Sequence, residues 1–239
     1  MSEAPARVPL RVLVLRPEPG AAATHAAARA RGLRAEAFPL FAVRPLAWQP
    51  VPPGDVDALL LGSANALRHG GAALAAYRGL PAYAVGETTA LAARAAGLEV
   101  VAAGAGGLQT LVEGLAPRHR RLLRLAGRER VALTVPPGVS VTTREVYASE
   151  PLAPSPGLLA ALSGPALALL HSGEAAARFA QVCEAAAIDR SQVALAAIGP
   201  RVAARAGTGW AALRCAAAPH DAALLALAVE MCQEAAPGQ

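Results

Sequence analysis

The sequence contains no lysine, since all 22 of its basic residues are arginine. A nucleotide-binding P-loop needs a lysine against the phosphates, and Schiff-base or pyridoxal chemistry needs a lysine amine, so both kinds of site are excluded. Aromatic residues make up only 3% of the chain. The three cysteines, Cys183, Cys215 and Cys232, are odd in number and far apart. This pattern predicts free thiols in a reducing compartment rather than a disulfide framework.

Long apolar runs and targeting signals are also missing. The first apolar run, Val12 to Leu15, is far too short for a signal peptide. The run from Leu158 to Leu170 is broken by Ser163, Gly164 and Pro165, and no run reaches the roughly 18 residues of a membrane span. We therefore expect a cytoplasmic protein with no membrane partner.

What the chain does contain suits a packed domain. Hydrophobic residues make up 54% of the 239 residues and charged residues 16%, which excludes a disordered or coiled-coil protein. The net charge is +5, and arginine prefers planar anions such as carboxylates or phosphates. Genomic bias toward Arg and Ala codons explains the arginine usage equally well.

Short apolar strands alternate with alanine-rich amphipathic stretches along the whole chain. Strands are expected at residues 11–17, 57–63, 81–86, 98–101, 121–127, 144–152, 167–171 and 193–198. Helices are expected at residues 21–32, 64–77, 87–97, 106–116, 173–179, 200–207 and 219–231. Continuous apolar strands that alternate with helices are typical of a parallel sheet covered on both faces.

The second half of the chain repeats the first in the same order. Ser172 stands 109 residues after Ser63, and Gly199 stands 113 residues after Gly86. Such a steady offset predicts an internal duplication, and therefore two α/β lobes with a cleft between them. Ligands of parallel sheets bind beyond the carboxyl ends of the strands, where helix N-termini favour anions. The turns that follow Leu61, Val85, Leu170 and Ile198 are therefore the expected walls of a site.

Several motifs resemble known sites without completing them. Gly104, Gly106 and Gly107 resemble a dinucleotide-binding loop, but the third glycine is replaced by Gln109. Ser63 and Ser172 do not lie in the G-x-S-x-G pattern of hydrolases, so they are better suited to cap a helix or to contact a ligand. The five histidines form no H-E-x-x-H pattern, which argues against a metal site.

Four residues near the predicted strand ends could serve a ligand. Thr88 and Thr89 follow Gly86 and could either cap a helix or grip a carboxylate. Arg128 follows a predicted strand and could face a cleft. Tyr147 could donate a proton or a hydrogen bond, or could be purely structural.

The order of these motifs resembles the uroporphyrinogen-III synthase family over nearly the whole chain. The matching motifs are "LVLRPEP", "AFPL", "LLLGSANALR", "YAVGETTALAARAAG", "LLRLAG", "VYASEP", "HSGEAAARF" and "LAAIGPRVAA". The resemblance implies two flavodoxin-like parallel-sheet lobes joined by a two-stranded linker. The implied first lobe comprises residues 1–38 and 153–239, the second comprises 44–146, and the linker strands are 39–43 and 147–152.

The resemblance also implies a function. The family's substrate is hydroxymethylbilane, a linear tetrapyrrole with eight carboxylates, which the enzyme dehydrates and cyclises in heme biosynthesis. Ring D is inverted through a spiro intermediate, and no cofactor or metal is required. The resemblance also implies that the protein is a monomer, and that its partner is this small molecule rather than a nucleic acid.

Matching residue by residue, Tyr147 corresponds to the family's cleft tyrosine and is the expected catalytic residue. Thr89 corresponds to the threonine of the family's G-x-x-T-A turn. The expected substrate-binding residues are Ser63, Asn65, Gly86, Thr88, Thr89, Arg128, Ser172 and Arg16. The turn from Gly199 to Arg201 departs from the family pattern, because Pro200 and Arg201 replace the usual Thr-Ala.

Two other functions remain open from the residues alone. One is a non-catalytic bilobal protein that binds or senses a small anion. The other is a nucleic-acid binder that uses the six arginines between Pro117 and Arg130. No aromatic residue interleaves those arginines, so the run lacks a stacking platform for bases.

Overall fold

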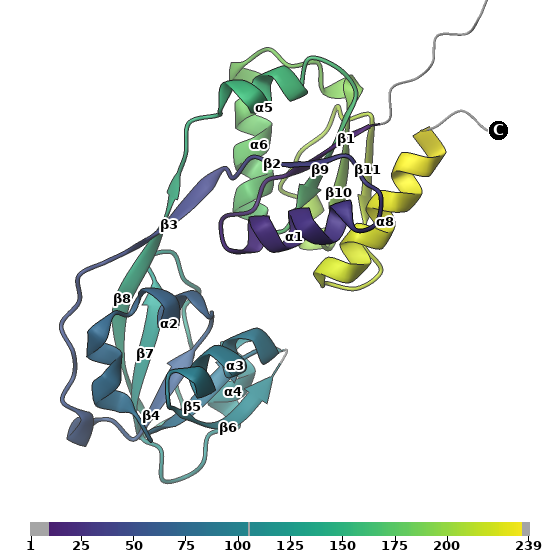
Figure 1. Ribbon diagram of the computed structural model, residues 1–239. Coiled ribbons are helices and arrows are strands. Elements are labelled where there is room, and N and C mark those ends of the chain that lie inside the picture. The colour runs from purple at the N-terminus through teal and green to yellow at the C-terminus, as the bar shows by residue number, and fades with distance from the viewer. Residues whose placement is uncertain (1–9, 105, 236–239) are drawn as a thin grey trace, which may run out of the picture. The chain divides into compact units, whose positions relative to one another are not determined.

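The computed structural model describes residues 10–104 and 106–235 (Figure 1). Its contacts divide the chain into two compact units. Unit 1 contains Met1–Ala42 and Pro151–Gln239, and unit 2 contains Val43–Glu150. The chain therefore passes between the units within β3 (Phe41–Pro45) and near the end of β8 (Ser140–Pro151).

Unit 1 is built on a parallel sheet with the strand order β11-β10-β9-β1-β2. These strands are β1 (Arg11–Val14), β2 (Ala35–Ala37), β9 (Ala166–Leu170), β10 (Val193–Ala197) and β11 (Ala212–Cys215). Strand β1 pairs with β9, and Val12 lies opposite Leu167. Segments from the two ends of the chain thus share one sheet.

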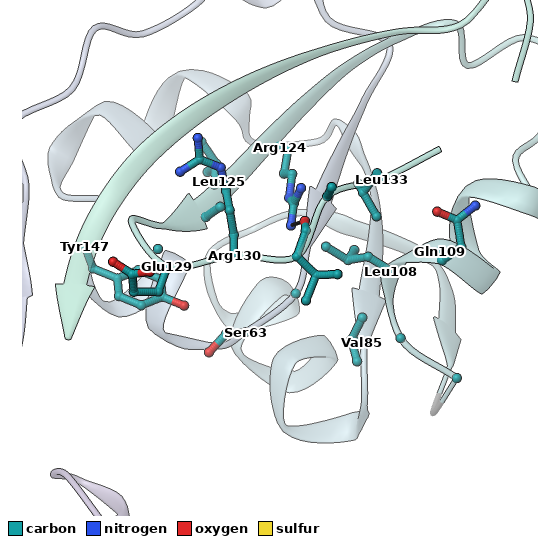
Figure 2. Close-up of a pocket in the computed structure, with 17 residues that line it drawn as sticks. Ser63, Val85, Leu108, Gln109, Arg124, Leu125, Glu129, Arg130, Leu133 and Tyr147 are labelled. Atoms are coloured by element: carbon teal, nitrogen blue, oxygen red, sulfur yellow. Dashed lines mark hydrogen bonds between the residues drawn. The ribbon is translucent and has the colours of Figure 1, made fainter. Parts of the chain in front are cut away.

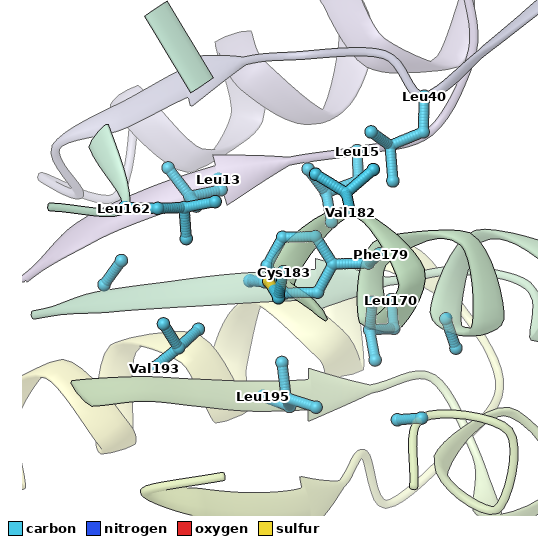
Figure 3. Close-up of a cluster of buried hydrophobic side chains, with 14 of the residues drawn as sticks. Leu13, Leu15, Leu40, Leu162, Leu170, Phe179, Val182, Cys183, Val193 and Leu195 are labelled. Atoms are coloured by element: carbon cyan, nitrogen blue, oxygen red, sulfur yellow. The ribbon is translucent and has the colours of Figure 1, made fainter. Parts of the chain in front are cut away.

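Helices cover both faces of this sheet because successive strand residues point to opposite sides. One face packs against α1 (Gly20–Arg29) and α8 (Asp221–Ala235). The other face packs against α5 (Pro156–Ala161), α6 (Gly173–Ala185) and α7 (Pro200–Ala203). Leu13 and Leu15 lie with Phe179 on the α6 side (Figure 3), whereas Val12 and Val14 lie on the α1 side.

Unit 2 has a second sheet with the strand order β3-β8-β7-β4-β5-β6, and β4 to β8 are parallel in their pairings. Its further elements are η1 (Pro53–Asp55), β4 (Ala58–Leu61), α2 (Asn65–His69), η2 (Ala72–Tyr77), β5 (Pro81–Val85), α3 (Glu87–Ala95), β6 (Glu99–Gly104), α4 (Leu108–Glu113) and β7 (Arg121–Gly127). Helices α2 and α3 pack on one face, and α4 packs on the other.

The predicted class, α/β with parallel sheets, is confirmed, but one local prediction needs correction and three elements were missed. The helix predicted at 64–77 is two short helices, α2 and η2, because Gly71 between them has a φ of 68°, in the left-handed region. Strands β2 and β11 and helix α5 were not among the expected elements. No described helix combines the length and the hydropathy that crossing a bilayer would require.

Candidate functional site

A pocket of about 370 Å³ opens in unit 2 where the strands end (Figure 2). This is the edge at which open parallel sheets bind their ligands. The lining residues come from the turn after β4, the end of β5, the loop after β6 and the start of α4. Others come from the second half of β7, the loop after it, and β8. The lining residues are Gly62, Ser63, Val85, Gly106, Gly107, Leu108, Gln109, Arg124, Leu125, Ala126, Gly127, Glu129, Arg130, Val131, Ala132, Leu133 and Tyr147.

Tyr147 reaches this pocket from an irregular point in the sheet. Ala126 pairs with Glu145, but the next residue, Gly127, pairs with Tyr147, so Val146 is an extra residue in β8. A β-bulge of this kind bends its strand and changes the direction of a side chain. The Tyr147 ring then packs directly over Gly127, where an added Cβ would approach the ring Cε2 to 2.7 Å. Only glycine leaves room for the ring in this position.

Ser63 lies at the turn between β4 and α2. Its Oγ accepts a hydrogen bond from the backbone N–H of Asn65 at 3.2 Å. Helix α2 has only five residues, and its N-cap residue is Ala64, whose side chain makes no capping hydrogen bond. The Ser63 hydroxyl therefore remains at the pocket wall with its own proton free to donate.

The charged residues of the pocket differ in whether an oppositely charged side chain lies beside them. Arg130 pairs with Glu145, whereas Arg124 is 7% exposed and makes no ion pair with any described residue. The pKa of Arg124 is lowered, chiefly by burial and then by the nearby charge of Arg130. Arginine starts from so high a pKa that Arg124 still carries its charge at neutral pH. Glu129 is the one carboxylate among the described lining residues.

Five of the predicted binding residues of unit 2 do not line the pocket. Asn65 accepts a hydrogen bond from Arg68, and Gly86 is the N-cap residue of α3. Thr88 is exposed, Thr89 is 4% exposed, and neither caps the helix. Arg128 is exposed and pairs loosely with Glu145, at 4.0 Å. Of the predicted set, the pocket brings together only Ser63 and Tyr147.

The two predicted binding residues of unit 1 make contacts within that unit. Ser172 is the N-cap of α6, and its Oγ accepts a hydrogen bond from the N–H of Ala175 at 3.1 Å. Arg16 donates a hydrogen bond to Thr24 at 3.2 Å and lies 3.5 Å from Asp221.

His171 belongs to the same polar cluster of unit 1. Its Nε2 lies 2.7 Å from Oδ1 of Asp221, and its side chain is 7% exposed. Burial lowers the pKa of His171, and the hydrogen bond with Asp221 opposes that effect only in part. We define the Asp221 cluster as Arg16, Thr24, His171 and Asp221.

The arrangement in unit 2 suits the binding and orientation of an anion with apolar parts. The pocket combines one buried cation, a phenol and a serine hydroxyl with apolar walls from Val85, Leu108 and Leu133. Within residues 10–104 and 106–235, no group of three or more His, Cys, Asp or Glu side chains could hold a metal ion. General acid assistance by a phenol is the chemistry that these groups could provide.

Sequence reasoning missed Arg124, Glu129 and Arg130. The sequence did contain a signal for Arg124. In the predicted strand segment "LLRLAG" (residues 122–127), Arg124 is the one charged residue among apolar and small residues. The glycines 106 and 107 were noted and set aside as an incomplete dinucleotide loop, yet they line the pocket.

Comparisons with known proteins agree on one family. The family described as "Uroporphyrinogen-III synthase HemD" matches residues 22–226, which is most of the chain. No curated protein matches the chain by sequence.

Solved structures show the same fold. Uroporphyrinogen-III synthetase from Helicobacter pylori is 16% identical, with a TM-score of 0.61 over 93% of this chain and 99% of that one. A mutant uroporphyrinogen III synthase from Thermus thermophilus is also 16% identical, with a TM-score of 0.54 over 95% and 99% of the two chains. The family match favours a biosynthetic enzyme over the non-catalytic binding protein that the residues alone had left open.

Proposed function

Since the chain belongs to the uroporphyrinogen-III synthase family, we propose that it cyclises hydroxymethylbilane to uroporphyrinogen III. Members of this family are cyclising lyases of heme biosynthesis. The family match over residues 22–226 is the observation that carries the proposal.

The reaction is a choice between two closures of one reactive intermediate. The first ring of the substrate loses its hydroxyl as water, which leaves an electrophilic azafulvene. The substituted carbon of ring D attacks it, and the resulting spiro intermediate fragments and recloses with ring D inverted. Without the enzyme, direct closure gives the type I isomer. A hundredfold preference for the inverted product needs about 2.7 kcal/mol of differential stabilisation, which orientation of the bound substrate can supply.

Tyr147 is the residue that we propose to assist departure of the hydroxyl. Its phenol can donate a hydrogen bond to the leaving oxygen, and its ring is fixed by packing over Gly127. The pocket holds no other phenol among its described lining residues. Ser63 is proposed to orient the substrate, because its hydroxyl lines the same pocket.

The remaining substrate contacts are proposals from the family resemblance. They are Asn65, Gly86, Thr88, Thr89, Arg128, Ser172 and Arg16. Both charged members have a carboxylate within their own unit, since Asp221 lies 3.5 Å from Arg16 and Glu145 lies 4.0 Å from Arg128. Gly86 needs no side chain for the role, because its backbone lies at the N-terminus of α3.

We also propose that units 1 and 2 are flavodoxin-like lobes that arose by duplication. The order β2-β1-β9-β10-β11 in unit 1 corresponds to the flavodoxin order 2-1-3-4-5. The order β8-β7-β4-β5-β6 in unit 2 matches it if β7 and β8 take the first two places. The linker proposed at residues 39–43 and 147–152 contains both points at which the chain changes unit.

A cytoplasmic location is a further proposal. Cys183, Cys215 and Cys232 are all free thiols, and Cys215 is exposed, which suits a reducing compartment. The monomeric state remains a prediction.

The test of the proposed function is the identity of the product. Purified protein is incubated with freshly prepared hydroxymethylbilane, and the products are oxidised and separated as isomers. The expected product is the type III isomer, whereas heat-denatured protein gives type I. Type I alone from the native protein would contradict the proposal.

A further inference from the structure

Arg124 is a buried cation that the fold of unit 2 does not neutralise. It lies in the middle of β7, on the face that packs against α4, and is 7% exposed. Burying an unpaired charge is costly, so buried arginines normally have a carboxylate partner. Among the described residues, no carboxylate lies within ion-pair distance of Arg124, although Arg121 pairs with Asp57 and Arg130 pairs with Glu145.

The hydrogen bonds of Arg124 are also incomplete. Its Nη2 donates to the backbone carbonyl of Val131 at 2.9 Å. Its Nε is buried and has no partner among the described residues. A guanidinium has five N–H donors, and one neutral carbonyl leaves the charge without a counter-ion among the described residues and the buried Nε–H without an acceptor.

The surroundings of Arg124 would strengthen its attraction for an anion. Leu108 and Leu133 line the same pocket, and Figure 2 shows them with Arg124 on one side while Glu129 and Tyr147 are drawn on the other. Apolar walls lower the local dielectric constant, so a charge pair formed there is stronger than one formed in open water. The guanidinium of Arg130 is already held by Glu145, which leaves Arg124 as the cation available to a ligand.

We propose that Arg124 binds one carboxylate of the tetrapyrrole substrate inside the pocket of unit 2. The inference rests on the proposed function for the identity of the ligand. The pocket volume of about 370 Å³ is near the lower end of small-molecule sites, so it accommodates one ring with its acidic side chains rather than the whole molecule. Tyr147 lines the same pocket, so the ligand that Arg124 anchors shares this pocket with the phenol.

A structural alternative is that Arg124 only braces the loop after β7 through Val131. Three variants separate the two roles. Arg124→Lys keeps the charge, Arg124→Gln keeps a donor for the Val131 carbonyl without the charge, and Arg124→Met removes both. Arg118→Met is the matched control, because Arg118 is exposed, belongs to the same arginine-rich run and does not line the pocket.

The experiment measures KM and kcat for hydroxymethylbilane, together with the binding of uroporphyrin, a stable octacarboxylate, by equilibrium dialysis. Loss of one charge-assisted hydrogen bond weakens binding about tenfold to a hundredfold. Arg124→Met and Arg124→Gln are therefore expected to raise KM and the uroporphyrin Kd by that factor, with a smaller change in kcat. Arg124→Lys should recover most of the affinity, and Arg118→Met should behave as the wild type.

Several outcomes would overturn the inference. Wild-type affinity in a folded Arg124→Gln protein would assign Arg124 to the loop alone. If Arg124→Met and Arg124→Gln both fail to fold, the Arg124→Lys protein decides, and complete loss of its affinity for uroporphyrin would contradict a role based on charge. A wild-type protein that produces no type III isomer refutes the proposed function instead, and the dialysis result then still reports whether Arg124 binds a polycarboxylate.

Discussion

The carboxyl edges of the two sheets use their polar side chains in different ways. In unit 1, the carboxylate of Asp221 accepts a hydrogen bond from Thr24 at 3.0 Å and pairs with His171 at 2.7 Å. Arg16 is the fourth member of the Asp221 cluster, and its Nη1 lies 3.5 Å from Oδ1 of Asp221. Each charged group of this cluster has a partner from the chain itself.

The edge of unit 2 lacks such a partner for its buried cation. Arg124 has only the carbonyl of Val131, and the Tyr147 phenol donates to no described residue. Groups that already satisfy one another stabilise a fold, whereas a buried charge left without a partner costs stability and stays available to a ligand. The difference supports the proposal of a site at Tyr147 and Arg124, and it indicates that the internal pairs of the Asp221 cluster contribute to stability.

The two serine turns show the same contrast on a smaller scale. Ser172 caps the 13-residue helix α6, whereas Ser63 accepts a hydrogen bond next to the five-residue helix α2 without being its N-cap residue. Similar sequences, "LLHSGEAAARF" and "LLLGSANALRH", therefore give one serine that caps a helix and one that lines the pocket of unit 2.

The largest effect is expected from Tyr147→Phe. General acid assistance contributes about 10²-fold or more to a rate, so kcat should fall at least about a hundredfold while thermal stability is unchanged. Tyr77→Phe is the control, because Tyr77 is buried against Val51 outside the pocket. Full activity in Tyr147→Phe would remove Tyr147 from catalysis.

Gly127→Ala should have the next largest effect. The new Cβ would come within 2.7 Å of the Tyr147 ring and force it out of position, and a displacement of about 1 Å can cost up to about a hundredfold in rate. We expect kcat to fall about tenfold to a hundredfold. Gly54→Ala is the control, since an added Cβ there meets nothing within 4 Å; equal activity of the two variants would argue against this positioning role.

Asp221→Ala should act on stability rather than on catalysis. It leaves His171 and Arg16 without their shared carboxylate, and we expect a loss of about 2 kcal/mol in the free energy of unfolding. The value is below that of a fully buried pair because the Asp221 side chain is 33% exposed. Urea denaturation measures it, and an unchanged midpoint would show that the cluster contributes nothing.

The same cluster predicts a pH dependence. Because burial lowers the pKa of His171 in the folded protein, the unfolded chain takes up the proton first as the pH falls below about 6.5. Wild-type stability should therefore decline from that pH downward, and His171→Gln should remove part of the decline. The free energy of unfolding of both proteins is measured from about pH 7 to about pH 5, the range around the usual histidine pKa. If the two curves run parallel over this range, His171 does not contribute to the pH dependence.

The smallest effects should distinguish the two serines. Ser172→Ala removes an N-cap and should cost about 1 kcal/mol, whereas Ser63→Ala should cost only a few tenths of a kcal/mol and should raise KM. Denaturation and steady-state kinetics on both variants check the ranking. A Ser63→Ala protein that is the less stable of the two would reverse it.

Much of the fold could be predicted because its signals are local. Apolar runs such as 58–61 and 166–170 are strands, and Ser172 was recognised as a suitable cap. Strand β11 (Ala212–Cys215) was missed because it has only four residues and is followed directly by three alanines, so no polar turn marks its end in the sequence.

The site was less predictable because it depends on pairings that the sequence does not display. Arg128 was expected to face a cleft, which stays a prediction; the structure shows it exposed, paired loosely with Glu145 and absent from the lining of the pocket in unit 2. Arg124 lies inside a strand, and which face a strand residue takes becomes known only from the packing of the sheet. Whether a nearby acid neutralises a charge is likewise a property of the folded chain.

The most direct test of the contrast between the two edges is a crystal structure of the protein with bound uroporphyrin. The account predicts a carboxylate of the ligand within hydrogen-bond distance of the Arg124 guanidinium, a ring beside Tyr147, and an Asp221 cluster with its internal pairs intact. A bound ligand that leaves the pocket of unit 2 empty would contradict it.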